Sequence, residues 1–252
     1  MRISFLGTGT SHGVPVIGCS CKVCKSKNPK NKRNRTSIHI KTENTNLLVD
    51  TPPEMRLELI NNNIQHVDAV VITHAHADHI MGFDDIRALN WQLGHEMPVY
   101  SDKKTLESLK RIFPYIFSES NQGGGIPQVK MIEIKKELKI NGENIIPLPI
   151  YHGENLILGY RIRNFAYMTD CSRIPNQTKK LLTGVDYIAV DSLRYSKHPT
   201  HFSVDEAVDF INELNVKKGY LTHISHQLDH EELNNYLPNH IEPAYDGMFI
   251  EI

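Results

Sequence analysis

The sequence predicts an α/β (α+β) protein with two mostly antiparallel or mixed β-sheets covered by helices. Its strand-like segments come in runs that helices interrupt, rather than in strict alternation of one strand with one helix. Hydrophobic residues make up 40% and charged residues 23% of the 252 positions, which is enough apolar material for a full core. No internal repeat or long linker divides the chain, so we expect one domain over residues 1–252.

The first half of the chain predicts five strands and three helices. Its strand segments are short runs of apolar or alternating character at residues 2–6, 36–41, 46–50, 67–73 and 98–100. Its helical segments are residues 54–63, 83–92 and 103–113. Gly7 and Gly9 permit a tight turn after the first strand, and Pro53 suits the first turn of the helix that follows it. Residues 12–35, rich in Gly, Cys, Lys, Asn and Arg, predict a loop.

The second half begins with Asn121-Gln122-Gly123-Gly124-Gly125, which predicts a flexible break. Strand segments follow at residues 129–134, 145–151, 157–163, 165–169, 186–190, 218–222 and 248–252. Helices are expected at residues 176–183, 203–214 and 229–237. Ser203 with Glu206 three positions later is the capping-box pattern, which places a helix start at Ser203.

The most informative segment is Thr73-His74-Ala75-His76-Ala77-Asp78-His79, directly after the apolar run Val67 to Ile72. His74 and His76 are two positions apart, so in extended backbone they point to the same side. Neutral imidazole and carboxylate suit zinc, manganese or iron. Four ligands from one short loop cannot all close on one ion. They fit two neighbouring ions if distant segments add further ligands.

Three other apolar strands end in residues that could supply those ligands. His152 follows the run Ile145 to Tyr151, Asp170 follows residues 165–169, and His223 follows residues 219–222. Parallel strand ends can converge on one cleft, so these side chains can meet the histidine-rich segment.

The complete ordered set resembles the ligands of the metallo-β-lactamase superfamily, and Gly7-Thr8-Gly9-Thr10 and Leu48-Val49-Asp50 match its N-terminal half. The resemblance implies an αββα sandwich of two mixed β-sheets flanked by helices, with the site at one edge. It implies two divalent metal ions, which can be Zn, Mn or Fe. The implied ligands are His74, His76 and His152 for the first ion, Asp78, His79 and His223 for the second, and Asp170 for both.

His201 lies between the Asp170 strand and His223. Its position resembles that of a histidine in the phosphodiesterase branch of the superfamily, which includes ribonuclease Z. The resemblance implies a residue beside the scissile phosphate that assists the leaving oxygen, a contribution worth typically 10²–10⁴-fold. The alternative is a histidine that merely stands at a helix start, next to the Ser203 cap.

Cys19, Cys21 and Cys24 form a tight C-x-C-x2-C cluster, which in a reducing compartment suggests metal binding more than disulfides. Three thiols need a fourth ligand to complete a tetrahedral zinc site, and His226 is the best candidate. Together with the Thr-His-x-Ser-His-Gln segment around His226, the cluster resembles the cyclic phosphate phosphodiesterases of the bacterial carbon–phosphorus lyase pathway. The implied feature is a structural zinc in a loop at about residues 17–35. The alternative is three reduced core cysteines, and lone Cys171 is expected to be a packed small residue.

The resemblance therefore predicts a metal-dependent hydrolase, most simply a phosphodiesterase for a small cyclic or nucleotide-like phosphodiester. A hydroxide that bridges both ions would attack phosphorus, and Asp78 and His201 are the expected catalytic residues. Ribonuclease Z itself is less favoured, because only residues 153–169 separate His152 from Asp170 and leave no room for its long arm. A thioester or lactone hydrolase of the same fold, and a non-catalytic cofactor-binding protein like those of pyrroloquinoline quinone biosynthesis, stay open.

The charge and hydropathy of the sequence limit the kinds of partner that the protein is expected to bind. The formal net charge of −1 argues against a generally basic nucleic-acid binder, although a local patch can still bind one. No apolar run approaches the roughly 20 residues of a membrane span. The first residues lack a signal-peptide core, so a cytoplasmic location is expected. The expected partner is a small-molecule phosphodiester, and the resemblance implies a homodimer.

Overall fold

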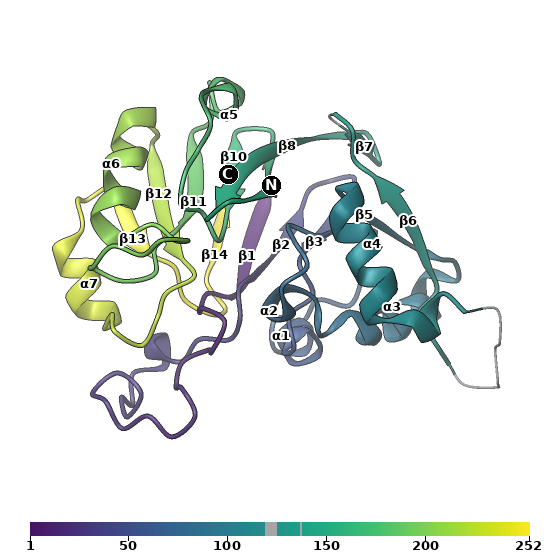
Figure 1. Cartoon of the computed structure of the whole chain (residues 1–252), viewed down its shortest axis with the longest axis horizontal. Helices are drawn as coiled ribbons and strands as arrows, with labels where there is room; N and C mark the ends of the chain where they lie inside the picture. The colour runs from purple at the N-terminus through teal and green to yellow at the C-terminus, as the bar shows by residue number, and fades with distance from the viewer. Residues whose placement is uncertain (119–124, 137) are drawn as a thin grey trace.

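The computed structural model describes residues 1–118, 125–136 and 138–252, which form two seven-stranded β-sheets with helices on both outer sides. Figure 1 shows α6 (Val204–Leu214) and α7 (His230–Tyr236) at the left and α3 (Ile86–Leu93) and α4 (Lys103–Ile112) at the right, with the strands between them. Most of the predicted break at residues 121–125 lies outside the described residues.

The first sheet has the strand order β14-β1-β2-β3-β4-β5-β6. Its strands are β1 (Arg2–Gly7), β2 (Ser37–Lys41), β3 (Asn46–Val49), β4 (Ala69–Val71), β5 (Met97–Ser101), β6 (Val129–Glu133) and β14 (Phe249–Glu251). The pairs from β14 to β3 are antiparallel and those from β3 to β6 are parallel, so the sheet is mixed.

The second sheet has the order β13-β12-β11-β10-β9-β8-β7. Its strands are β7 (Leu138–Ile140), β8 (Glu143–His152), β9 (Asn155–Ile162), β10 (Phe165–Met168), β11 (Tyr187–Asp191), β12 (Lys218–Thr222) and β13 (Ile241–Pro243). The strands from β7 to β10 pair antiparallel, and those from β10 to β13 pair parallel. The parallel half therefore carries the ends of β10, β11 and β12 to the same edge.

Three apolar clusters show the four layers of the sandwich. One lies between the sheets and joins Phe5 of β1 to Tyr167 of β10. A second packs the first sheet against α1 (Met55–Asn61), α3 and α4. A third packs the second sheet against α6, α7 and the residues Ile174, Leu182 and Val185 that flank α5 (Asn176–Leu181). The predicted αββα sandwich is confirmed.

Most predicted elements appear within one or two residues of their expected ends. The hairpin of β2 and β3 and the capping box of Ser203 and Glu206 form as predicted. The strand expected at residues 67–73 is shorter, and residues 83–85 form a 3-10 turn before α3. The short β7 and β13, and α2 (Ala77–Ile80) within the histidine-rich segment, were not anticipated.

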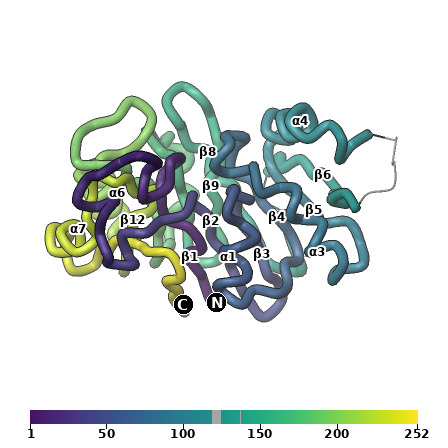
Figure 2. The backbone as a smooth tube through the Cα atoms, turned by 90° about the horizontal axis from the view of Figure 1, so that it is seen from below, coloured from purple at the N-terminus to yellow at the C-terminus, as the bar shows by residue number. Residues whose placement is uncertain are grey.

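The two ends of the described chain meet at one edge of the first sheet, as Figure 2 shows. The amino group of Met1 donates a hydrogen bond to the carbonyl oxygen of Ile252, 2.7 Å away. Between β1 and β2 the long loop returns across the C-terminal half of the chain, where Gly9 bridges to Ile224. This crossing brings the cysteines of the loop to the segment after β12.

Candidate metal centre

The structure gathers all seven predicted dinuclear ligands at the ends of four strands. The ligand atoms of His74, His76 and His152 lie within 4.8 Å of one another. So do those of a second group, which comprises Asp78, His79, Asp170 and His223. His74 follows β4, His152 ends β8, and Asp170 and His223 follow β10 and β12. The two groups have the composition that the resemblance implied for two neighbouring ions.

Left-handed backbone at three strand ends turns polar side chains into the site. Asp50, Asp170 and His223 have φ angles of 65°, 55° and 59°. This region costs a residue with a side chain roughly 1–2 kcal/mol. Each of the three comes one or two positions after an apolar strand. Such strained residues persist only where the surrounding structure holds them, and they cluster at functional sites.

The imidazole rings are held through their Nδ1 atoms. Nδ1 of His79 lies 2.8 Å from Asp50 Oδ2, and Nδ1 of His152 lies 2.9 Å from the carbonyl oxygen of Thr200. Nδ1 of His74 lies 3.0 Å from the Thr73 hydroxyl. A ring that donates from Nδ1 presents the lone pair of Nε2, which is the form that binds a metal ion.

The free atoms of the site fit metal ions. The Nε2 atom of His74 is buried and has no hydrogen-bond partner among the described residues. A buried polar atom without a partner costs about 1–3 kcal/mol, unless a ligand such as a metal ion satisfies it. Burial lowers the pKa of His74 well below its ordinary value, so this ring is neutral, as a ligand must be.

The carboxylates make the centre attractive to positive charge. Burial opposes a charge on His79, yet the carboxylates of Asp170 and Asp78 raise its pKa well above the ordinary value. Nε2 of His79 lies 3.1 Å from Asp170 Oδ2 and 3.4 Å from Asp78 Oδ2. The donor set of imidazole nitrogen and carboxylate oxygen suits Zn²⁺, Mn²⁺ or Fe²⁺ in the place of that proton.

His201 lies beside the gathered ligands, as expected from its position in the sequence. Its ligand atom falls within 4.8 Å of those of His152 and Asp170, and its ring stacks on that of His223 at 4.7 Å. Nδ1 of His201 donates to Asp191 Oδ2 over 2.9 Å. The helix start at Ser203 is also present, so His201 both precedes the cap and faces the site.

Asp50 and Asp191 are site residues whose roles the sequence did not reveal. Asp50 supports His79, and Asp191 supports His201 and lies 3.4 Å from Nδ1 of His223. Each carboxylate stands at the end of an apolar strand, β3 or β11. A carboxylate at the end of an apolar strand is the sequence signal that identified Asp170, and the same signal marks Asp50 and Asp191.

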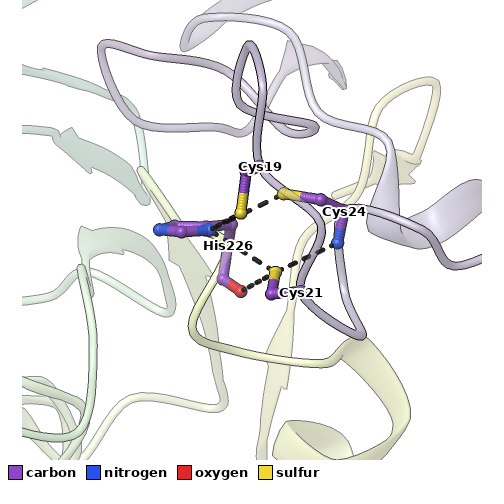
Figure 3. Close-up of side chains that lie close together, drawn as sticks. All are labelled: Cys19, Cys21, Cys24 and His226. Carbon is purple, nitrogen blue, oxygen red and sulfur yellow. Dashed lines mark hydrogen bonds between the residues drawn. The ribbon is translucent and has the colours of Figure 1, made fainter.

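The cysteine loop forms a second cluster, shown in Figure 3. The sulfur atoms of Cys19, Cys21 and Cys24 lie 3.3, 3.5 and 3.6 Å from Nδ1 of His226. His223 belongs to the dinuclear site, whereas His226, three positions later, belongs to the cysteine cluster. The backbone N–H of Cys24, 3.4 Å from the Cys21 sulfur, lowers the pKa of Cys21 to about 6. A lowered thiol pKa favours the thiolate, which is the form that binds zinc.

Cys171 is separate from this cluster. It is fully buried in the apolar cluster beneath α6, and burial raises the pKa of its thiol well above the ordinary value. A neutral buried thiol behaves as a small apolar residue.

An αββα sandwich with imidazoles and carboxylates gathered at its strand ends defines the class of metallo-β-lactamase-fold hydrolases. The chain belongs to the beta-lactamase superfamily, whose family model, described as a beta-lactamase superfamily domain, matches residues 45–224. The class is that of metal-dependent hydrolases, and its fold implies divalent metal ions. Among the described helices, none has the length and apolar character to cross a membrane.

Similar proteins place the chain within the superfamily. The crystal structure of a diphosphatase from the PhnP family is 40% identical, covers 100% of this chain and 97% of its own, and superposes with a TM-score of 0.93. An octanoyltransferase of Porphyromonas gingivalis is 36% identical over 253 residues, which are 98% of this chain and 51% of that protein. The chain therefore spans about half the length of this curated relative. Human tRNase Z, short form, is 17% identical with a TM-score of 0.72 and covers 100% of this chain and 99% of its own, so it shares the fold.

Proposed function

We propose that the protein is a phosphodiesterase that hydrolyses a small cyclic or nucleotide-like phosphodiester. The observation that supports this most directly is the position of His201, whose ring lies against the ligands His152 and Asp170. An imidazole that lies beside a dinuclear site without being one of its predicted ligands suits a reaction in which an alkoxide leaves phosphorus.

The gathered side chains would hold the metal ions in the arrangement that the resemblance implies. His74, His76 and His152 would hold one ion, Asp78, His79 and His223 the other, and Asp170 both. When bound, such ions lower the pKa of water and neutralise charge on phosphate oxygens. Asp50 keeps His79 in the required tautomer, and Thr200 does the same for His152.

His201 would handle the proton of the leaving group. Its Nδ1 donates to Asp191, which leaves Nε2 as the nitrogen that can reach substrate. A proton held at Nε2 can pass to the departing oxygen, so that the alcohol leaves in neutral form.

The test is turnover of bis-p-nitrophenyl phosphate by Asp78→Ala and His201→Ala. We expect both variants to lose at least about 10²-fold in kcat. His201→Ala should retain the metal content of the wild type by elemental analysis, whereas Asp78→Ala should bind less metal. His66→Ala is the matched control, because His66 is a half-exposed histidine paired with Asp68. Full activity in both site variants would refute the assignment.

A diphosphate linkage is a second candidate substrate bond, favoured by the 40% identity to the diphosphatase. Acyl-ester or thioester hydrolysis is a third, because the relative of P. gingivalis is named as an octanoyltransferase. A panel of bis-p-nitrophenyl phosphate, ADP and p-nitrophenyl octanoate separates the three. Cleavage of the octanoate alone would replace the phosphodiesterase proposal.

We also propose that Cys19, Cys21, Cys24 and His226 hold a structural zinc. The convergence of three sulfur atoms on one imidazole nitrogen supports this over three unrelated core thiols. The ion would tie the loop to the segment after β12, next to His223. The homodimer and the cytoplasmic location stay predictions.

A further inference from the structure

We propose that a polar pocket around His39 binds a small hydroxylated carboxylate, of the class of sugar acids, at a site separate from the metal centre. The pocket lies on the helix-facing side of the first sheet, next to the turn that follows α1. The inference goes beyond the proposed function, because none of the residues gathered in the metal centre lines this pocket.

The pocket exists because the strands change character along their length. On the helix-facing side of β1, Leu6 packs in the apolar cluster beneath α1, whereas Ser4 and Arg2 line the pocket. On β3, Leu48 lies in the same cluster and Asn46 lines the pocket. Side chains two positions apart share one face of a strand, so polar residues here replace core residues. They surround a volume of about 460 Å³.

The pocket and the metal centre lie at opposite ends of two parallel strands. Asn46 opens β3 at the pocket, and Asp50 follows the other end of β3, where it holds His79. His66 of the pocket precedes β4, and His74 of the metal centre follows it. A ligand in the pocket is therefore separated from the predicted ions by the length of these strands.

Two cations border the pocket without a carboxylate partner. Arg2 and Lys41 line it, and no ion pair joins either to a carboxylate among the described residues. The guanidinium of Arg2 stacks on the ring of Phe249 at 3.9 Å. Stacking uses the flat face of the guanidinium, so its N–H groups, which lie in the plane, can still bind an anion. The lining includes no Asp or Glu among the residues that the structure describes.

The surrounding charges favour an anion with a single negative charge. Asp68 lies behind the lining, where its carboxylate accepts from the backbone N–H of Asn46. Arg2 and Lys41 also border a second hollow, which Glu43 and Glu251 line as well. These carboxylates offset part of the positive charge of the two cations. A carboxylate carries one charge, whereas a phosphate monoester carries close to two.

A buried imidazole in the lining lacks a partner. His39 is only 5% exposed, and its Nε2 atom has no hydrogen-bond partner in the described part of the chain. Burial, assisted by the charges of Lys41 and Arg2, lowers the pKa of His39 to about 4. The ring is therefore neutral at pH 7, with one N–H group and one lone pair. An unpaired buried polar atom costs about 1–3 kcal/mol, and a ligand hydroxyl is a suitable partner for it.

The rest of the lining suits hydroxyl groups better than apolar ones. It supplies one hydroxyl and four side-chain amides, which are those of Ser4, Asn46, Asn62, Asn63 and Gln65. An amide both donates and accepts hydrogen bonds, as a sugar hydroxyl does. Ile64 is the one apolar residue of the described lining, which contains no Phe, Tyr or Trp, so a nucleobase or an acyl chain would find little to pack against. The volume falls within the roughly 300–1,000 Å³ of small-molecule sites.

The binding test titrates the metal-loaded protein with gluconate in an isothermal calorimeter. Lys41→Met should raise Kd at least about tenfold, because a charge-assisted hydrogen bond is lost. Lys139→Met is the matched control, since Lys139 is an exposed strand lysine on β7 of the other sheet, and it should bind like the wild type. The melting temperatures of both variants should match the wild type. No binding of gluconate, or equal Kd values in the two variants, would overturn the inference.

Related ligands test the proposed class. Glucose lacks the charge and should bind at least about tenfold more weakly than gluconate. Glucose 6-phosphate tests a phosphate ester in place of the carboxylate. If it binds more tightly than gluconate and Lys41→Met abolishes the difference, the carboxylate assignment is wrong.

Proton NMR locates the ligand without a change at the charged residues. The ring C–H signals of His39, identified by their absence in His39→Gln, should shift when gluconate is added to the wild type. Signals of His39 that stay in place while the calorimeter records binding would put gluconate elsewhere and refute the site.

Discussion

The carboxylate of Asp191 accepts a hydrogen bond from Nδ1 of His201 over 2.9 Å. The same oxygen, Oδ2, accepts the backbone N–H of Cys171, and Oδ1 lies 3.4 Å from Nδ1 of His223. Asp191 is fully buried, so its charge is not screened by water. One carboxylate therefore stands behind both the proposed general acid and one of the predicted metal ligands.

Asp191→Asn should lower kcat on bis-p-nitrophenyl phosphate by about 10–100-fold, the usual cost of losing a partner that orients a site residue. The amide keeps the shape of the side chain but removes the charged acceptor that orients the ring of His201. We expect KM to change little, because Asp191 lies behind the histidines and does not face substrate. The measurement is steady-state kinetics together with elemental analysis.

The metal content of Asp191→Asn shows whether the variant loses activity through His201 or through His223. If Asp191 acts through His201, Asp191→Asn retains its metal, and adding it to His201→Ala lowers kcat no further. If it acts through His223, the variant loses metal in proportion to activity. Wild-type kcat in Asp191→Asn would show that the hydrogen bond to His201 has no part in the reaction.

Cys24→Ser should remove one equivalent of zinc per chain and lower the melting temperature. A structural zinc contributes its binding free energy to folding, and a serine hydroxyl is a poor ligand for it. His226→Ala should lose the same equivalent. Cys171→Ala is the control. Cys171 lies in the apolar core, so this variant should keep the full zinc content. Retention of all zinc in Cys24→Ser would contradict the proposed site.

Features that depend on nearby residues could be predicted from the sequence. The hairpin of β2 and β3 follows from two short strands and a polar turn, and the start of α6 follows from Ser203 and Glu206 three positions apart. His152, Asp170 and His223 were identified because each ends an apolar run. Their grouping around the segment of residues 74–79 came from the family resemblance, because no local pattern states which strand ends meet.

Features that depend on distant partners could not be predicted in the same way. The three-residue strands β7 and β13 exist as strands because β8 and β12 offer them hydrogen bonds. Asp50 becomes a partner of His79, 29 residues later, only because β3 and β4 lie side by side. The pocket around His39 likewise requires the turn after α1 to stand beside β1 and β2.

Gly82→Ala should destabilise the fold by about 1–3 kcal/mol, the range for an overpacked site. A methyl group at this position would overlap the carbonyl oxygen of Pro52, which is backbone and cannot move aside. The N–H of Gly82 donates a hydrogen bond to the carbonyl oxygen of Thr51, and the N–H of Thr51 donates one to the carbonyl oxygen of His79. The strain would therefore reach the metal centre. Urea unfolding measures the loss. Gly125→Ala, where no atom of the described residues lies within 4 Å, should leave the stability unchanged.

His39 should make the protein less stable in acid. Its side chain is buried on β2, and burial, assisted by the charges of Lys41 and Arg2, lowers its pKa from 6.5 to about 4. Between these values the unfolded chain binds a proton that the native chain does not. The free energy of unfolding is therefore fully retained above pH 6.5 and falls by up to about 3 kcal/mol as the pH drops to 4.

His39→Gln removes this titration, so the difference in unfolding free energy between pH 7 and pH 4.5 should be about 2–3 kcal/mol smaller in the variant. Metal release in acid affects both proteins alike, and His66→Gln, at a half-exposed histidine, should keep the wild-type dependence. An unaltered pH dependence in His39→Gln would show that the buried imidazole is not the group responsible.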